Sequence, residues 1–169
     1  MDAGIVLSVS ATTRHARPQE LDGQHYRFLS KEDFLAKMIA GEFLEWAEVY
    51  GNYYGTLHDQ VQKRLDAGKD VILEIDTQGA TQIRSACPDA IFVFLLPPSY
   101  GELHRRICCR AADSAENIKL RLSKAEYEMS LADGYDYHIV NNTVEQAAAE
   151  LLAVLKKEKG RRGEREVTC

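Results

Sequence analysis

Several features that define other protein classes are missing from this sequence of 169 residues. No apolar run approaches the roughly 20 residues of a membrane-spanning helix, and no basic segment followed by an apolar one marks a secretion signal. Basic residues are not in excess, because the net charge is −5, which argues against a general nucleic-acid binder. We therefore expect a cytoplasmic protein that binds neither membranes nor nucleic-acid polymers, although a local arginine cluster can still hold a single nucleotide.

Cysteine is scarce and has no spacing that suggests a metal site or a disulfide framework. The four cysteines, Cys87, Cys108, Cys109 and Cys169, form no CxxC or Cys/His pattern. We expect reduced thiols and no protein-bound metal. Apolar residues make up 45% of the chain, which suffices for one domain with a real core.

A glycine-rich phosphate loop is also absent from the sequence. The pattern G-x-x-x-x-G-K-[ST] occurs nowhere. The only Gly-Lys pair, Gly68-Lys69, is followed by Asp70 and has Lys63 where the first glycine should stand. The backbone cradle and the lysine that such a loop offers to nucleotide phosphates are therefore missing from this chain.

Hydrophobic patterning predicts an α/β fold in three layers, a parallel sheet flanked by helices, with a β-rich first third. Ser30, Ser99 and Thr143 stand where helix caps are expected. The expected strands cover residues 5–10, 25–29, 42–50, 51–56 (after a turn), 70–76, 90–96 and 137–140. The expected helices cover residues 31–39, 57–67, 77–86, 100–110, 113–133 and 144–158.

The stretch from Ser8 to Arg17 combines hydroxyl and guanidinium groups. Four hydroxyl side chains occur within six residues, and Arg14 and Arg17 follow them. Hydroxyls and bidentate guanidinium groups are what a phosphate needs, but a polar loop with solvated arginines explains the stretch more simply on its own. Its position matters, because ligands of open parallel sheets bind beyond the carboxyl ends of the strands. Glu74 and Asp76 end one expected strand and Asn141 follows another, although a helix cap explains Asp76 equally well.

Two further clusters are chemically suggestive. The first contains Tyr26, Glu45, Tyr53, Tyr54 and Thr56. The Glu45 carboxylate suits the N1–H and N2–H₂ edge of guanine, which adenine cannot match. Aromatic packing in a small sheet explains these residues as well. The second cluster is basic and lies on two consecutive expected helices. It suits a mobile flap over transferring phosphates, or a solvated helix face with ion pairs, and contains Arg105, Arg106, Arg110 and Arg121.

The order and spacing of these motifs closely resemble those of guanylate kinase. The resemblance runs from residue 8 to residue 141 without a large gap. It is carried by Ser8-Val9-Ser10-Ala11-Thr12-Thr13-Arg14 with Arg17-Pro18, Asp22-Gly23, Tyr26, the stretch Gly41 to Ala47, the stretch Gly51 to Thr56, the stretch Leu73 to Ala80, Leu96-Pro97-Pro98-Ser99 and Val140-Asn141.

This resemblance implies a P-loop kinase-like core with a small GMP-binding insertion and a helical lid. One domain would span residues 1–158, with the insertion at about 10–57 and the lid at about 101–123, and residues 159–169 would form a disordered tail. The implied activity is phosphoryl transfer from ATP to GMP, giving ADP and GDP in purine nucleotide metabolism. The implied partners are GMP and ATP, and Mg²⁺ would accompany ATP without a direct protein ligand.

The resemblance also implies roles for individual residues. On the acceptor side, the GMP phosphate would be held by Arg14, Arg17, Tyr26 and Tyr54, and the guanine would be surrounded by Ser10, Glu45, Thr56 and Glu74. On the donor side, Asp76 would lie near the metal and phosphates, and Asn141 would contact the ATP adenine. The lid arginines, which with Arg14 and Asp76 would serve catalysis, correspond to Arg106, Arg110 and Arg121.

Two departures from the family pattern bear on activity. The family begins with a buried strand, a Walker A loop and a helix, and none of these occurs here. In the lid, Cys109 and Ala111 stand where the family has glycines. We therefore expect a guanylate kinase whose N-terminus is truncated or whose start was misassigned, with impaired activity. The alternative is a non-catalytic module of the same fold that binds GMP or a protein.

Overall fold

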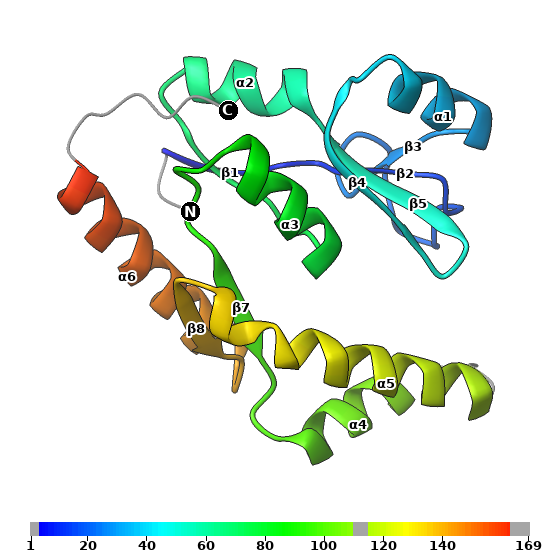
Figure 1. Ribbon diagram of the computed structural model, residues 1–169, viewed down its shortest axis with the longest axis vertical. Helices are drawn as coiled ribbons and strands as arrows, with labels where there is room; N and C mark the ends of the chain where they lie inside the picture. Colours follow the sequence, from blue (N-terminus) through cyan, green and yellow to red (C-terminus); the bar gives the residue numbers. More distant parts are fainter. Residues whose placement is uncertain (1–3, 110–114, 163–169) are drawn as a thin grey trace. The chain divides into compact units, whose positions relative to one another are not determined.

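The computed structural model describes residues 4–109 and 115–162 (Figure 1). The chain divides into two compact units, the first holding the described residues up to Ala90 and the second those from Ile91 onward. Helices and strands alternate in both units, and parallel strand pairs occur in each. The predicted α/β class with parallel strands is therefore confirmed.

The first unit contains a parallel pair made of β1 (Ile5–Leu7) and β6 (Asp70–Ile72). Both strands are shorter than predicted. Pairing stops where the Ser8 N–H donates to the Ile72 carbonyl at 2.9 Å, so Glu74 and Asp76 follow β6 in a loop rather than end the strand. The unit also contains α2 (His58–Asp66) and α3 (Thr77–Ala86), the latter with the predicted bounds.

A four-stranded sheet forms the rest of the first unit. One of its inner strands, β2, lies in the segment that was predicted to be a loop. This strand forms because distant segments pair with it, β3 in parallel on one side and β5 antiparallel on the other. Local sequence pattern does not report such pairing. The strands in spatial order are β3 (Arg27–Phe28), β2 (Ala11–Thr12), β5 (Asn52–Leu57) and β4 (Phe43–Val49), and α1 (Lys31–Ile39) follows β3 in the chain.

An aromatic cluster connects this sheet to α1. Phe34 of α1 is fully buried and stacks on Phe43 and Tyr53, with ring centroids 4.3 and 5.5 Å apart. Tyr50 and Gly51 join β4 to β5 as a two-residue turn with positive φ at both positions, 51° and 77°. This turn type matches the twist of paired strands and fixes the register of the hairpin. The hairpin in turn places Glu45 opposite Thr56.

The second unit is built on the parallel pair of β7 (Val93–Leu96) and β8 (Tyr137–Val140). β7 begins at Val93 rather than Ala90, because its partner begins at Tyr137. The Ser99 hydroxyl accepts from the Glu102 N–H, as expected of a cap. The helical elements are α4 (Tyr100–Cys109), α5 (Ala115–Ser130), the short η1 (Ala132–Gly134) and α6 (Val144–Arg162).

The last helix corrects the predicted boundary of the tail. α6 continues to Arg162, so residues 159–162 are helical rather than disordered. Glu158 anchors this end: it is buried and accepts from the Tyr137 hydroxyl at 2.6 Å and from Arg161 at 2.9 Å. The predicted tail beyond Arg162 lies outside the described residues.

Cys87 corrects a second expectation. Its side chain is fully buried and disulfide-bonded, so the prediction of reduced thiols is wrong for this residue. Spacing along a sequence does not report which side chains approach within bonding distance. Cys108 is a free, exposed thiol, as predicted. None of the described helices combines the length and the apolar character that a bilayer crossing needs.

Candidate functional site

A small pocket in the first unit gathers three of the predicted site residues. Ser10, Tyr26 and Glu74 line a space of about 80 Å³. Such a volume holds a few water molecules or one small polar group. Ser8 also lines it, and the Ser8 hydroxyl oxygen is buried without a hydrogen-bond partner in the described structure. His25 adds an imidazole to the wall that the sequence did not single out.

Arg14 is held firmly next to this pocket. Its guanidinium donates from Nη1 to Glu20 Oε2 at 3.0 Å and from Nη2 to Glu20 Oε1 at 2.9 Å, and Nη1 also donates to the His15 carbonyl at 2.7 Å. The rings of Tyr26 and Phe28 lie 5.4 and 5.9 Å from the guanidinium carbon. Both ion-pair partners are mostly buried, with 17% and 16% of the side chains exposed. Arg14 therefore has one well-defined position.

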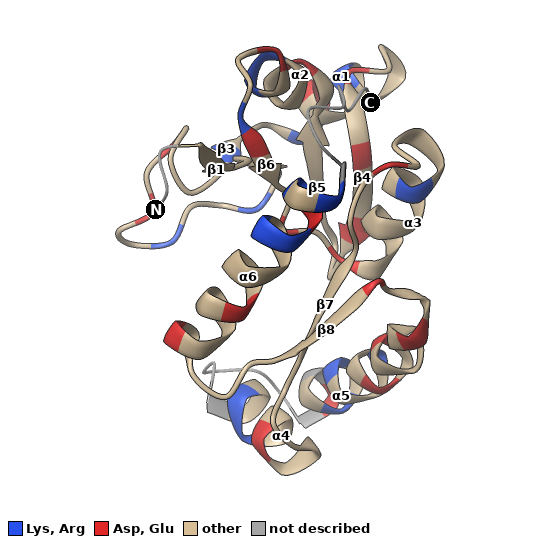
Figure 2. Cartoon of the chain, turned by 90° about the vertical axis from the view of Figure 1, so that its left-hand side faces the viewer, with Lys and Arg blue, Asp and Glu red and all other residues tan. Residues whose placement is uncertain are grey.

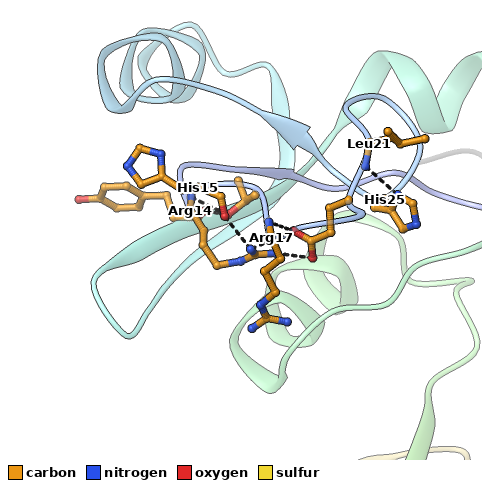
Figure 3. Close-up of polar contacts among 8 residues, drawn as sticks. Arg14, His15, Arg17, Leu21 and His25 are labelled. Atoms are coloured by element: carbon orange, nitrogen blue, oxygen red, sulfur yellow. Dashed lines mark hydrogen bonds and ion pairs between the residues drawn. The ribbon is translucent and has the colours of Figure 1, made fainter. Parts of the chain in front are cut away.

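Arg17 begins the turn that brings Glu20 back to Arg14. The Arg17 carbonyl accepts from the Glu20 N–H at 3.0 Å, and the Arg17 N–H donates to Glu20 Oε2 at 2.7 Å. Pro18 and Gln19 occupy the centre of the turn, where Gln19 has a positive φ of 77°. The Arg17 side chain is exposed, and Figure 3 shows it extending away from the contacts of its own backbone.

Tyr26 and Tyr54 lie together beside Arg14. Their ring centroids are 6.1 Å apart in an edge-to-face arrangement, and the Tyr54 hydroxyl interacts with the Arg14 guanidinium. Burial raises the pKa of the Tyr26 hydroxyl, and the Glu74 carboxylate adds to the shift. The Tyr26 hydroxyl therefore stays protonated at neutral pH and can donate a hydrogen bond to an anion.

Glu45 is a deeply buried carboxyl group, with 5% of the residue exposed. It lies on β4 opposite Thr56 of β5. Burial raises the pKa of Glu45, Thr56 partly opposes this shift, and the Asp76 carboxylate adds to it. The hydroxyl of Thr56 is fully buried and has no hydrogen bond of good geometry to the described residues. The Thr56 hydroxyl beside Glu45 thus retains hydrogen-bonding capacity.

Helix α3 closes around Glu45 from the other side. A Cβ atom at Gly79 would lie 2.5 Å from Glu45 Oε2 and 3.1 Å from Glu45 Cδ, so only glycine leaves room for the carboxyl group. Gln82, one turn further along the helix, donates to the Trp46 carbonyl at 2.7 Å and accepts from the Trp46 N–H at 3.2 Å. These contacts fix the strand segment that carries Glu45.

Asp76 caps α3, which is the alternative left open by the sequence. Its Oδ1 accepts from the N–H groups of Gln78 and Gly79 at 3.0 and 2.9 Å, and its Oδ2 accepts from Gln78 Nε2 at 3.1 Å. No group of three or more potential metal ligands occurs within the part of the chain that the structure describes.

In the second unit, two predicted donor-side residues contact each other. Arg106 donates from Nη2 to the Asn141 carbonyl at 3.1 Å and from Nε to Glu102 Oε1 at 2.7 Å. Glu102 also accepts from Arg105, and the two arginines lower the pKa of Glu102 to about 2. Arg121 lies half-buried on α5, and Figure 2 shows charges of both signs on α4 and α5. Arg110 lies outside the described residues.

Several residues of the first unit that contribute to the site were not singled out in the sequence. Glu20 had a signal, since an acid in a basic stretch three residues after Arg17 can close a turn onto it. Gln82 had none, and Gly79 stood in the stretch Leu73 to Ala80 without a role of its own, because the roles of both depend on α3 packing against β4. Gln24 and His25 enter only through the pocket lining.

Known proteins of one family are similar to this protein over nearly the whole chain. The family model described as guanylate kinase matches residues 2–158. A guanylate kinase from Symbiobacterium thermophilum is 49% identical over 158 residues, 94% of this chain and 75% of the relative. One from Vibrio parahaemolyticus is 49% identical over 153 residues, 90% of this chain and 74% of the relative.

A solved structure gives the same result. The crystal structure of guanylate kinase from Anaplasma phagocytophilum matches with a TM-score of 0.79 at 37% identity, covering 92% of this chain and 76% of that one. The chain belongs to the guanylate kinase family.

Proposed function

We propose that this protein acts on GMP as phosphoryl acceptor and ATP as donor, and that the first unit holds GMP. The observation that carries the proposal is the Glu45 carboxyl, buried beside a Thr56 hydroxyl that lacks a well-placed partner. Leaving a buried hydroxyl such as that of Thr56 without a well-placed partner costs about 1–3 kcal/mol. A ligand that supplies the missing hydrogen bonds recovers this free energy on binding.

Guanine is the base whose edge fits these groups. Its N1–H and N2–H₂ groups can both donate to the two oxygens of Glu45, and its N7 and O6 atoms accept hydrogen bonds. Adenine presents an unprotonated N1 to the same position, so the buried carboxyl would lose its partners. A site of this kind rejects the wrong base because its own polar groups would remain unpaired.

The arginine-rich loop is proposed to hold the acceptor phosphate. Arg14 lies beside Tyr26 and Tyr54, and these groups together offer guanidinium and hydroxyl donors. Ser10 adds a hydroxyl at the adjacent pocket, and the exposed side chain of Arg17 is long enough to approach an anion there. Bidentate arginine contacts suit phosphate oxygens better than a point charge does.

The second unit is proposed to serve the donor side of the reaction. Asn141 would contact the ATP adenine, and Arg106, Arg110 and Arg121 would stabilise the charge of the transferring phosphoryl group. Mg²⁺ would arrive bound to the ATP phosphates and offset part of their charge. Transfer would depend on positioning and exclusion of water rather than on a covalent enzyme intermediate.

The rate of transfer by this chain is proposed to be low. The sequence contains no Walker A motif, so the backbone amides and lysine that would stabilise the β- and γ-phosphates are not available. The competing possibility is a module of this family that binds GMP or a protein partner without catalysis. The retained acceptor-side residues favour binding of GMP over a role limited to protein contacts.

Two measurements on the 169-residue chain test this proposal. Calorimetric titration should detect GMP binding, and a coupled ATP/GMP assay should detect slow turnover at most. GMP binding with no ATP binding and no turnover would favour the non-catalytic module. Turnover at the full rate of guanylate kinases would contradict the proposed impairment, and absence of GMP binding would contradict the proposal as a whole.

A further inference from the structure

Glu20 receives three hydrogen bonds, all from the two arginines proposed to hold the acceptor phosphate. Two come from Arg14 Nη1 and Nη2, at 3.0 and 2.9 Å, and the third comes from the Arg17 backbone N–H at 2.7 Å. The resemblance assigned no role to Glu20. Its carboxylate nevertheless touches both arginines and is mostly buried, with 16% of the side chain exposed.

The contacts use one particular edge of the Arg14 guanidinium. A guanidinium carries five N–H groups. Two on Nη1 go to Glu20 and to the His15 carbonyl, and one on Nη2 goes to Glu20. The other two, Nε–H and the second Nη2–H, lie on a common edge. The Tyr54 hydroxyl also hydrogen-bonds to this side chain, and the rings of Tyr26 and Phe28 lie against the guanidinium. That edge is a second bidentate donor pair.

The backbone holds Glu20 in this position. Arg17 and Glu20 close a four-residue turn through the 3.0 Å bond between the Arg17 carbonyl and the Glu20 N–H. Pro18 and Gln19 fill its centre, and Gln19 has the φ of 77° that a type II turn requires at its third position. Residues other than glycine rarely adopt a positive φ. The contacts around the turn therefore hold Gln19 in this conformation.

Resting on the proposed GMP site, we propose that Glu20 is a positioning residue for the acceptor phosphate. Its carboxylate occupies the end of the Arg14 guanidinium and thereby presents the Nε–Nη2 edge to the phosphate. The rings of Tyr26 and Phe28 restrict the plane of the same guanidinium. Arg14, through hydrogen bonding above all, lowers the pKa of Glu20, so the carboxylate stays ionised at neutral pH. Glu20 itself would not touch the ligand.

The experiment compares GMP with guanosine, which has the same base but no phosphate. Dissociation constants of both ligands are measured by NMR titration for the wild-type chain and for Glu20→Gln, which keeps the shape but cannot accept from both Nη groups. We expect a rise of about tenfold in the GMP constant and no change for guanosine, since only the phosphate contact is misplaced. Glu42→Gln is the matched control, because it removes a carboxylate from the Lys37 ion pair of the same unit.

Two further variants keep the inference open to refutation if Glu20→Gln folds poorly. Glu20→Asp keeps the charge and should bind GMP more tightly than Glu20→Gln. In an Arg14→Lys background, adding Glu20→Gln should not weaken GMP binding further, because the lysine has no guanidinium edge to orient. Thermal unfolding of each variant reports whether the fold is retained.

The outcomes separate this inference from the proposed function. An unchanged or lower GMP constant in Glu20→Gln would overturn the inference, the lower value meaning that Glu20 competes with the phosphate. Equal weakening of GMP and guanosine would overturn it in favour of a purely structural role. A wild-type chain that binds neither ligand would overturn the proposed function, and this inference with it.

Discussion

The two units each contain an arginine paired with a glutamate, and the two pairs differ in what surrounds them. In the first unit, Arg14 and Glu20 form a bidentate pair with 17% and 16% of their side chains exposed. In the second unit, Arg106 and Glu102 lie one helical turn apart with 36% and 24% exposed. The first pair also includes aromatic rings and a backbone turn. The second pair joins neighbours on one helix, and Arg106 adds one hydrogen bond to the Asn141 carbonyl.

This difference has energetic consequences. Exposed pairs on one helix contribute about 0.3–0.5 kcal/mol and are screened by salt. A mostly buried pair with additional hydrogen bonds resists screening and fixes side-chain geometry. We infer that the first unit is pre-organised around its polar groups, whereas the arginines of α4 can exchange their partners at small cost.

The largest effect is expected for Glu45→Gln. The amide presents a donor where guanine also donates, so the GMP dissociation constant should rise about 100-fold. Unfolding should occur at a higher temperature at neutral pH, because the substitution removes a buried group that is costly to ionise. Calorimetry and thermal unfolding measure the two changes. Unchanged GMP affinity would show that this carboxyl does not face the base.

A smaller effect is expected for Gly79→Ala. The new methyl group would lie 2.5 Å from Glu45 Oε2, so the carboxyl group must move. The GMP dissociation constant should rise by about tenfold, since a shift of this size misplaces a hydrogen-bonding group. Ser85→Ala, on the exposed side of the same helix, is the control and should leave GMP affinity intact. Equal effects of the two substitutions would argue against the close packing of α3 on Glu45.

The smallest effect is expected at Glu102. The folded pKa of about 2 lies below the unfolded value, so the carboxylate stabilises the protein above pH ~4.3 and loses this effect as the pH falls toward 2. Glu102→Gln should therefore lower the thermal midpoint slightly at pH 7 and low salt, and not at all in high salt. Its GMP affinity should equal that of the wild type. A clear loss of GMP affinity would show that the two pairs are not independent.

Local pattern predicted the elements whose boundaries are set within the chain segment itself. The carboxylate of Asp76 caps the start of α3, and the bounds Thr77–Ala86 were predicted in full. Tyr137–Val140 was likewise predicted as a strand. Glu45 and Thr56 were grouped from composition and motif, and the hairpin register does bring them opposite each other.

Features that depend on distant segments were not predictable in this way. Strand β2 forms because β3 and β5 pair with it, and β6 ends early because β1 ends. The space that Gly79 leaves for Glu45 exists only once α3 packs on β4. Helix α6 extends beyond its predicted end because Glu158 accepts a hydrogen bond from the Tyr137 hydroxyl of β8.

The proposed selectivity of the first unit for a guanine nucleotide can be measured in a single comparison. Calorimetric titration of the wild-type chain with GMP and with AMP, under the same conditions, compares two ligands with the same phosphate and ribose. GMP should bind, and AMP should bind at least 100-fold more weakly, because adenine leaves the Glu45 carboxyl unpaired. Equal affinities for GMP and AMP, or no binding of either, would contradict it.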